Sequence, residues 1–225
     1  MNHLQLQARL TELGYDTGSP GWGPRCRAAT IAALTDGPDH ALTSFDISEA
    51  SAQLGVDSAS IWTVWDVEAS GSPFIGGRPT ILFEPHRFSR ATGRRYDVSH
   101  PSLSSRAWNK ALYPRTQAAR YEQMLDAVAL DVDAGFASAS YGGFQILGEN
   151  HLICGAVTPW AFAWRQAQTE GDQLAAFVAF VEGSGLKAAL RRRDWAAFAK
   201  GYNGTAYRVN RYDERLAAAY AKRSK

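Results

Sequence analysis

The sequence predicts a mostly helical α+β fold with one small antiparallel β-sheet. From residue 45 onward, apolar residues recur at helical spacing in several capped segments. One short segment, Thr80–Glu84, instead joins β-branched and aromatic residues after a Gly- and Pro-containing turn, which is typical of a strand. At 225 residues the chain is long enough for a small module followed by one domain of about 180 residues.

The first part of the chain predicts two short helices around a turn. Leucines at helical spacing run up to Gly14, a Gly- and Pro-rich turn follows, and Pro24 stands where a second helix begins. The Asp-, Gly- and Pro-containing segment Thr35–Thr43 is a plausible boundary. We therefore expect a short helical segment over residues 1–42 and a main domain over residues 45–225.

Within the main domain, the expected elements follow from caps and breakers. Asp57 is expected to cap a helix that runs through Glu68 and ends at Ser70-Gly71. The strand Thr80–Glu84 follows, and residues 89–110, rich in Ser, Arg and Gly, predict an irregular loop beside a cleft. Further helices are expected over Thr116–Asp131, from Thr158-Pro159, over Asp172–Val181, over Trp195–Lys200 behind Asp194, and over Asp213–Ala221.

The charge of the chain is unevenly distributed. The net charge is +2, yet residues 184–225 hold 11 Lys and Arg against 3 Asp and Glu. This basic end favours contact with an anionic surface such as an outer envelope, the alternative being a solvated helix face. Nucleic acid fits poorly as a partner, because no basic-aromatic reader motif accompanies the charge.

The cysteines and the N-terminus indicate the compartment of synthesis. Cys26 and Cys154 lack CxxC spacing and are expected to be buried thiols, as in a protein made in a reducing cytosol. No basic-then-apolar signal pattern follows Met1, and no apolar run reaches about 18 residues. We expect a protein made in the cytoplasm that leaves it only with the help of another protein.

Three short motifs carry most of the functional signal. They are Glu68-Ala69-Ser70-Gly71, Gly142-Gly143-Phe144-Gln145-Ile146 and Gly201-Tyr202-Asn203-Gly204. In this order they resemble the Glu-Ser, Gly-Leu-Met-Gln and Ala-Tyr-Asn boxes of goose-type lysozymes and lytic transglycosylases, with Phe144 in place of Met. The surrounding stretches resemble the phage N-acetylmuramidase (endolysin) family. The resemblance implies a lysozyme-like domain that acts on the glycan strands of peptidoglycan.

Glu68 is the candidate general acid. Cleavage of a β-1,4 glycosidic bond needs a protonated carboxylic acid beside the leaving oxygen. Glu68 lies at the end of the predicted helix, near Trp62 and Trp65, where partial burial and the negative helix end both raise a carboxyl pKa. A raised pKa keeps such an acid protonated near neutral pH.

Glu84 is the candidate second carboxylate, at the end of the predicted strand. The stretch Arg78–Phe88 resembles the Arg-Pro-x-Ile-Leu-Phe-Glu-x-His-x-Phe segment of the phage family, and His86 within it is expected to contact substrate. A purely structural role for Glu84, paired with Arg78, Arg87 or His86, is the competing interpretation. Two further carboxylates stay open at this point: Asp66, which points about 200° around the helix from Glu68, and Asp97 on the loop.

The two remaining motifs are expected to line the sugar subsites. Glycine allows a ligand to approach the main chain, so Tyr141 and Gly143 are placed beside the substrate, the alternative being a tight helix start. By resemblance, Gln145 bonds near the scissile sugar, Tyr202 stacks on or orients the acid, and Asn203 bonds an N-acetyl group. A plain turn after a helix is the alternative for the last motif, since Asn-Gly favours turns.

Other chemistries find no support in the sequence. The five histidines are scattered without metal-ligand spacing, and no phosphate loop or nucleophile elbow is present, so neither a metal nor a cofactor is expected. The leading hypothesis is an endolysin that cuts between N-acetylmuramic acid and N-acetylglucosamine as a monomer, and that reaches the periplasm or wall through a holin. The alternatives are a lytic transglycosylase with the same Glu68, which leaves 1,6-anhydro ends, and a catalytically inactive wall-binding protein.

The N-terminal segment has a resemblance of its own. Its phrases Leu-Gly-Tyr-Asp, Gly-Trp-Gly-Pro-Arg and Ala-Ala resemble the first half of the repeat in helical peptidoglycan-binding modules. A complete module carries a further helix and turn. A helical hairpin that packs on the main domain is the alternative for residues 1–42.

Overall fold

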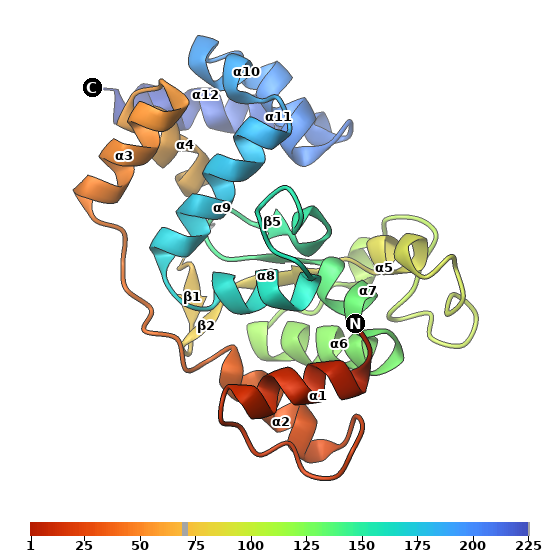
Figure 1. The fold of residues 1–225 in the computed structure, drawn as a ribbon. Helices are drawn as coiled ribbons and strands as arrows, with labels where there is room; N and C mark the ends of the chain where they lie inside the picture. Colours follow the sequence, from red (N-terminus) through yellow and green to blue (C-terminus); the bar gives the residue numbers. More distant parts are fainter. Residues whose placement is uncertain (69–71, 225) are drawn as a thin grey trace.

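The computed structural model describes residues 1–68 and 72–224. In them, short strands lie among helices. Figure 1 shows the strands near the middle of the molecule, one group of helices at the end that holds the C-terminus, and the first two helices at the opposite end. The α-helices are α1 (His3–Glu12), α2 (Pro24–Ala33), α3 (Ser44–Leu54), α4 (Ser58–Glu68), α5 (Pro85–Ala91), α6 (Gln117–Leu130), α7 (Val132–Ala137), α8 (Pro159–Gln166), α9 (Glu170–Gly183), α10 (Lys187–Arg192), α11 (Trp195–Asn203) and α12 (Tyr212–Arg223). The short 3-10 helices are η1 (Lys110–Leu112), η2 (Gly148–Asn150) and η3 (Tyr207–Asn210).

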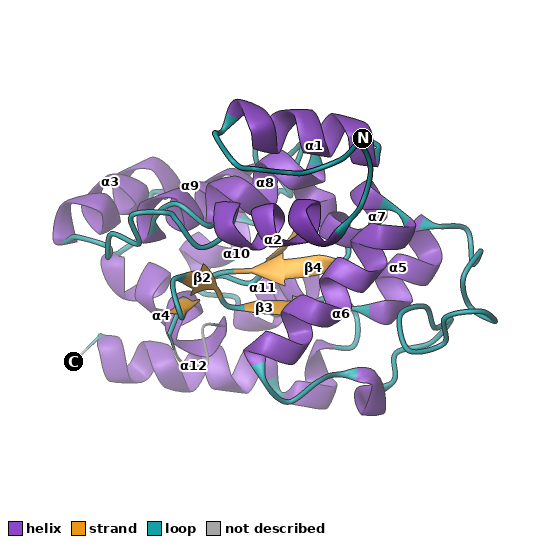
Figure 2. Ribbon diagram, turned by 90° about the horizontal axis from the view of Figure 1, so that it is seen from below, coloured by secondary structure: helices purple, strands orange, loops and turns teal. Residues whose placement is uncertain are grey.

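The predicted strand belongs to a three-stranded antiparallel sheet, and the α+β fold class is confirmed. β3 (Ile81–Phe83) pairs with β4 (Ala139–Tyr141), which in turn pairs with β5 (Ile146–Leu147). Figure 2 shows helices on all sides of this sheet. A separate hairpin joins β1 (Phe74–Ile75) to β2 (Arg78–Pro79).

One local expectation and one alternative differ from the structure. The segment 89–110 was expected to be an irregular loop, yet its first residues continue α5, because Pro85 occupies the first turn of that helix behind Glu84 as the N-cap. The motif at Gly142-Gly143 is the turn between β4 and β5 and does not start a helix. Ala69-Ser70-Gly71, where the first motif and the predicted helix end, lie outside the described residues.

The two N-terminal helices pack on the main domain. Arg27 of α2 forms ion pairs with Glu122 at 2.5 Å and Asp126 at 3.0 Å, both on α6. The ring nitrogen Nε2 of His3 lies 2.9 Å from the Val128 carbonyl oxygen of the same helix. Leu10 and the other buried residues of this hairpin belong to one continuous apolar core with the main domain. These contacts place the hairpin against α6, and wall binding by residues 1–42 stays a prediction.

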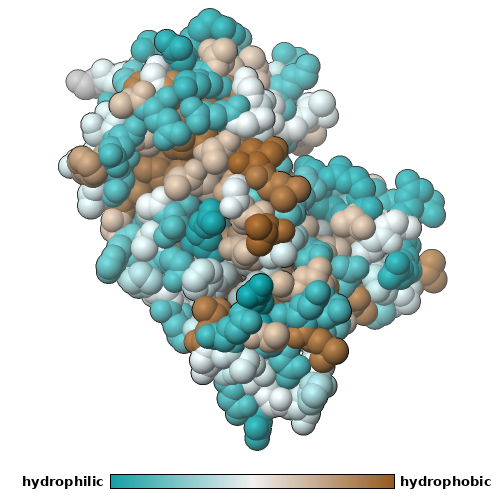
Figure 3. Space-filling model, viewed as in Figure 1, coloured by the Kyte–Doolittle hydropathy of each residue, from teal (hydrophilic) through white to brown (hydrophobic). Residues whose placement is uncertain are grey.

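The surface and the thiols complete the description. The face in Figure 3 is mostly hydrophilic, with an apolar patch near its middle. Cys26 and Cys154 are both buried free thiols, and burial raises the pKa of the Cys154 thiol to about 11. Within residues 1–68 and 72–224, no helix has the length and apolar character that a membrane crossing requires.

Candidate active site

The final residue of α4, Glu68, lies beside the ends of α11 and α12. The helix starts as its sequence predicts, since the Asp57 carboxylate accepts hydrogen bonds from the Ser60 backbone N–H at 2.8 Å and from the Ser60 hydroxyl at 2.6 Å. Ile61, Val64 and Val67 are buried in the core and fix the helix. Glu68 itself is half-buried. The core therefore holds the backbone that carries the carboxyl group while one side of the residue stays accessible.

The environment of Glu68 suits an acid. Burial raises its pKa from an ordinary carboxyl value to about 7, while the hydrogen bond from Asn203 and the charge of Arg215 oppose that rise. Arg215 also donates a hydrogen bond of 2.8 Å to the Val67 carbonyl oxygen, one residue before the acid. A carboxyl group with this pKa is protonated in a large share of molecules at neutral pH.

Asn203 contacts the acid directly. Its side-chain amide donates a hydrogen bond of 2.8 Å to Glu68 Oε1. Its other atom, Oδ1, is buried and has no hydrogen-bond partner among the described residues. The sequence analysis expected Asn203 to bond an N-acetyl group. In the structure its amide nitrogen binds Glu68 instead, and its Oδ1 accepts no hydrogen bond from the described residues.

Tyr202 links the third motif to the β4–β5 turn. Its hydroxyl donates a hydrogen bond of 2.7 Å to the Phe144 carbonyl oxygen in the β4–β5 turn. Its ring stacks on Phe198 and meets the edge of Phe180. Burial, followed by the nearby charge of Glu68, raises the pKa of the Tyr202 hydroxyl well above its usual value. Tyr202 thus joins α11 to the turn, without a hydrogen bond to Glu68 in the described structure.

At both glycines of the second motif, the space beside the Cα is filled by a side chain from a helix. Gly142 has a φ of +70°, and a Cβ there would lie 2.3 Å from Gln173 Cδ. A Cβ on Gly143 would lie 2.4 Å from Trp65 Cζ3 on α4. The Gly143 N–H also donates a hydrogen bond of 2.7 Å to Gln173 Oε1. The space beside the Gly143 Cα, where a sugar was expected, is therefore filled by Trp65 of α4.

Gln145 braces the same turn. Its backbone is left-handed, with a φ of 50°. Its amide nitrogen donates to the carbonyl oxygens of Gly142 at 2.7 Å and Thr80 at 3.0 Å, and its Oε1 accepts from the Ser140 hydroxyl at 2.8 Å. Both amide protons are used, so only a lone pair of Oε1 remains for a ligand.

Tyr141 differs from the expectation of a substrate contact. The side chain is fully buried, and its hydroxyl donates a hydrogen bond of 2.9 Å to the Phe136 carbonyl oxygen. Burial raises the pKa of this hydroxyl well above its usual value. Tyr141 therefore supports β4 from the core side and presents no surface to a sugar.

Glu84 lies at the junction of β3 and α5, among cations. Its Oε2 is 3.2 Å from His86 Nε2 and 3.6 Å from Arg87 Nε. Arg87 and Arg90 also bind Glu149, at 2.6 Å and 2.9 Å. Burial raises the pKa of Glu84 while Arg87 lowers it, and burial lowers the pKa of His86. The pairing with Arg87 and His86 matches two of the three structural partners that the sequence suggested.

The third suggested partner and the rival carboxylates are engaged elsewhere. Arg78 lies over the Tyr121 ring at 4.8 Å. Asp66 accepts two hydrogen bonds of 2.7 Å from Arg223, and Asp97 accepts one of 2.6 Å from the Ser104 hydroxyl. Within the described residues, neither Asp66 nor Asp97 forms a hydrogen bond with the groups that contact Glu68.

Tyr212 connects the two carboxylates electrostatically. Burial raises the pKa of its hydroxyl, the charge of Glu68 raises it further, and the charge of Glu84 adds a smaller effect. Tyr212, at the start of α12, therefore lies within electrostatic range of both glutamates. Within the described part of the chain, no three His, Cys, Asp or Glu side chains come together as a metal site.

This geometry can be compared with known proteins. The family model described as N-acetylmuramidase matches residues 57–224. The chain belongs to the N-acetylmuramidase family. The muramidase is similar to the Burkholderia AP3 phage endolysin, with 30% sequence identity and a TM-score of 0.73, over 99% of this chain and 94% of that chain. No curated protein matches the muramidase sequence. Family membership confirms a peptidoglycan-cleaving glycosidase with a lysozyme-like fold.

Several contacts of the muramidase site carry no motif signal. Tyr212 and Arg215 belong to the helix that sequence analysis assigned to envelope binding, and Gln173 lies in the middle of an ordinary helix. Trp65 is the exception. Its position three residues before Glu68 puts the indole on nearly the same face of α4 as the acid, and helical spacing reveals that relation.

Proposed function

We propose that the chain is an endolysin that cleaves the β-1,4 bond between N-acetylmuramic acid and N-acetylglucosamine, with Glu68 as general acid. The observation that carries the proposal is the half-buried carboxyl of Glu68, whose pKa is about 7 and whose Oε1 accepts the Asn203 amide. The proton of Glu68 passes to the glycosidic oxygen as the bond to the anomeric carbon breaks. Water then completes hydrolysis and leaves a reducing end.

Glu84 is proposed to balance the positive charge that develops on the sugar. Arg87 favours the ionised form of Glu84, while burial has the larger and opposite effect, so the pKa of Glu84 is raised overall. In this proposal Glu84 acts at a distance as a charge, or orders the attacking water.

The remaining predicted contacts divide into two groups. His86 and the open lone pair of Gln145 Oε1 are proposed to meet substrate, because both side chains are only partly buried, beside Glu84 and in the β4–β5 turn. Gly143 and Tyr202 are proposed to fix the position of the β4–β5 turn relative to Glu68. Asn203 Oδ1 has no hydrogen-bond partner among the described residues but is buried, so Asn203 is proposed to act on Glu68 and not on an N-acetyl group.

The proposal also covers how the protein reaches the cell wall. We propose a monomer that is made in the host cytoplasm and reaches the wall after a holin opens the inner membrane. Contact of the basic C-terminal helix with an anionic envelope stays a hypothesis. Its support is reduced by the structure around it, since Arg215, Arg211 and Arg223 already bind groups of the chain.

The test is mass spectrometry of fragments released from purified peptidoglycan by wild type and by Glu68→Gln. Reducing N-acetylmuramic ends from wild type and none from the variant are expected. Glu49→Gln, an exposed residue of α3, is the matched control and is expected to behave as wild type. Fragments lighter by one water would instead indicate a lytic transglycosylase, and release by Glu68→Gln at the wild-type rate would show that the acid lies elsewhere.

A further inference from the structure

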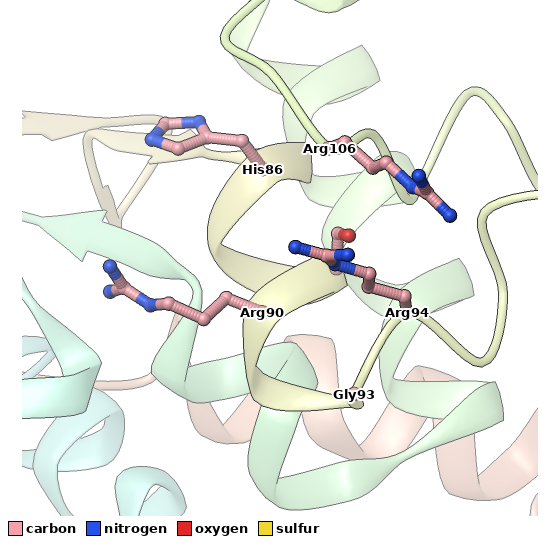
Figure 4. A pocket seen from close by; sticks show the side chains of 6 residues that line it. His86, Arg90, Gly93, Arg94 and Arg106 are labelled. Atoms are coloured by element: carbon pink, nitrogen blue, oxygen red, sulfur yellow. The ribbon is translucent and has the colours of Figure 1, made fainter.

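A basic pocket lies beside Glu84 and is not used by the proposed chemistry. Its lining residues come from α5, the turn that follows α5 and the loop beyond it, as Figure 4 shows. They are His86, Ser89, Arg90, Gly93, Arg94 and Arg106. Three of the six lining residues are therefore arginines.

The local charge balance is positive. Arg90 binds Glu149, which Arg87 shares, and Arg106 lies 3.5 Å from Asp97. Arg94 forms no side-chain hydrogen bond or ion pair within the described residues. The arginines around the pocket thus exceed the carboxylates available to them, and an anion that enters meets unsatisfied donors.

The backbone directs Arg94 toward the pocket. Gly93 and Arg94 both have left-handed backbones, with φ of 60° and 66°, and the Arg94 N–H donates a hydrogen bond of 2.7 Å to the Ser89 carbonyl oxygen. This reversal turns the chain back at the end of α5, and Figure 4 shows the Arg94 guanidinium lying over the helix. Arginine is not a residue that a left-handed backbone favours, so the position is not explained by the turn alone.

The distance from Glu84 suits a chain attached to the substrate. His86 both lines the pocket and contacts Glu84. The rise of α5 and its following turn puts Arg94 roughly 10–15 Å along the surface from Glu84. An extended peptide covers about 3.3–3.6 Å per residue, so three to four residues span that distance. Muramic acid carries a peptide stem of this length, and the stem bears free carboxylates.

We propose that the pocket formed by Arg90, Arg94 and Arg106 binds a carboxylate of the peptide stem on muramic acid. This inference rests on the proposed function, since it requires a muramic acid sugar near Glu68 and Glu84. Arginine binds carboxylates in a fixed forked geometry, and a stem tethered to the bound sugar reaches the pocket at high effective concentration. The enzyme is thereby selective for peptide-bearing glycan over bare glycan.

The test compares two substrates: natural peptidoglycan, and the same glycan strands freed of peptide by an amidase. The variant Arg94→Asn removes the unpaired cation with a residue that tolerates a left-handed backbone. Arg94→Lys keeps the charge, and Arg9→Gln on α1 is the matched surface control. On peptide-bearing strands Arg94→Asn is expected to raise KM by up to about fivefold with little change in kcat, because an exposed ion pair is worth about 0.2–1 kcal/mol and remote binding acts on KM. On bare strands it is expected to equal wild type.

The outcomes separate the two proposals. Partial rescue by Arg94→Lys, together with an unchanged Arg9→Gln, supports a stem site. An equal loss on both substrates, or no loss on either, overturns the stem site while the muramidase proposal stands. Wild type that releases nothing from either substrate would overturn the proposed function and the stem site with it.

Discussion

The side-chain amide of Asn203 donates a hydrogen bond of 2.8 Å to Glu68 Oε1, and thereby joins the end of α11 to the end of α4. The contact both orients the acid and favours its ionised form, against the effect of burial. One amide therefore sets the position and the proton affinity of the same carboxyl group.

Asn203→Ala is expected to raise the pKa of Glu68 further. A hydrogen bond to a charged group contributes about 1.5–3 kcal/mol, so its loss raises the pKa by about one unit or more. The alkaline limb of kcat/KM against pH is expected to move upward by that amount, while the maximal rate falls about tenfold because the acid is no longer held. The exposed Asn210→Ala is the control; an unchanged alkaline limb in Asn203→Ala would contradict the assignment.

Glu68→Gln is expected to stabilise the protein above neutral pH. The folded-state pKa of about 7 exceeds the usual carboxyl value, so the folded state binds more protons and the free energy of unfolding falls as pH rises from about 4.5 to 7. The full cost, about 1–3 kcal/mol, is present above pH 7 and absent at pH 4. Thermal melts of the variant should therefore exceed those of wild type by several degrees at pH 8 and match them at pH 4. Equal melting temperatures at pH 8 would mean that the carboxyl is better solvated than the structure indicates.

Gly142→Ala is expected to damage the β4–β5 turn more than a matched glycine elsewhere. Gly142 and Gly185 both have a φ of +70°, but a Cβ at Gly142 meets Gln173 at 2.3 Å while nothing lies within 4 Å at Gly185. Both substitutions carry a backbone cost of about 1 kcal/mol, and overpacking adds about 1–3 kcal/mol at Gly142 alone. Denaturant unfolding of the two variants measures the difference, and comparable losses would argue against the tight packing of Gln173 on the turn.

Deletion of residues 213–225 is expected to abolish activity on isolated walls as well as on intact cells. In α12, Arg215 binds the Val67 carbonyl, Tyr220 donates to Asp57 at 2.7 Å, and Arg223 binds Asp66. All three partners lie on or next to the helix that carries the acid. An envelope-binding helix that serves only entry would spare activity on isolated walls, so turbidity assays on both substrates distinguish the two roles.

Much of the fold follows from local sequence rules. The cap at Asp57, the proline starts at Pro24 and Pro159, and the strand around Leu82 depend on neighbours within a few residues, and all four are present. Helix α5 was missed because the Ser- and Arg-rich segment that follows it obscured its proline start at Pro85.

The site was harder to predict, because its geometry depends on distant segments. The identity of Glu68 as a buried, acidic helix end could be inferred from its flanking tryptophans. The packing of Trp65 on Gly143 and the bond from Tyr202 to Phe144 join positions far apart in sequence, and no local pattern records them. Tyr141 was misplaced for the same reason, since a motif shows that a residue is near a site but not which way its side chain points.

The 135-residue separation between Glu68 and Asn203 affects the order in which the site forms during synthesis. During synthesis the ribosome releases Glu68 first, while its amide partner follows 135 residues later, and Arg215, which binds the Val67 carbonyl oxygen, follows later still. A nascent or prematurely terminated chain therefore carries an acid without the groups that position it. The contacts around Glu68 can therefore form only after both α11 and α12 have been synthesised.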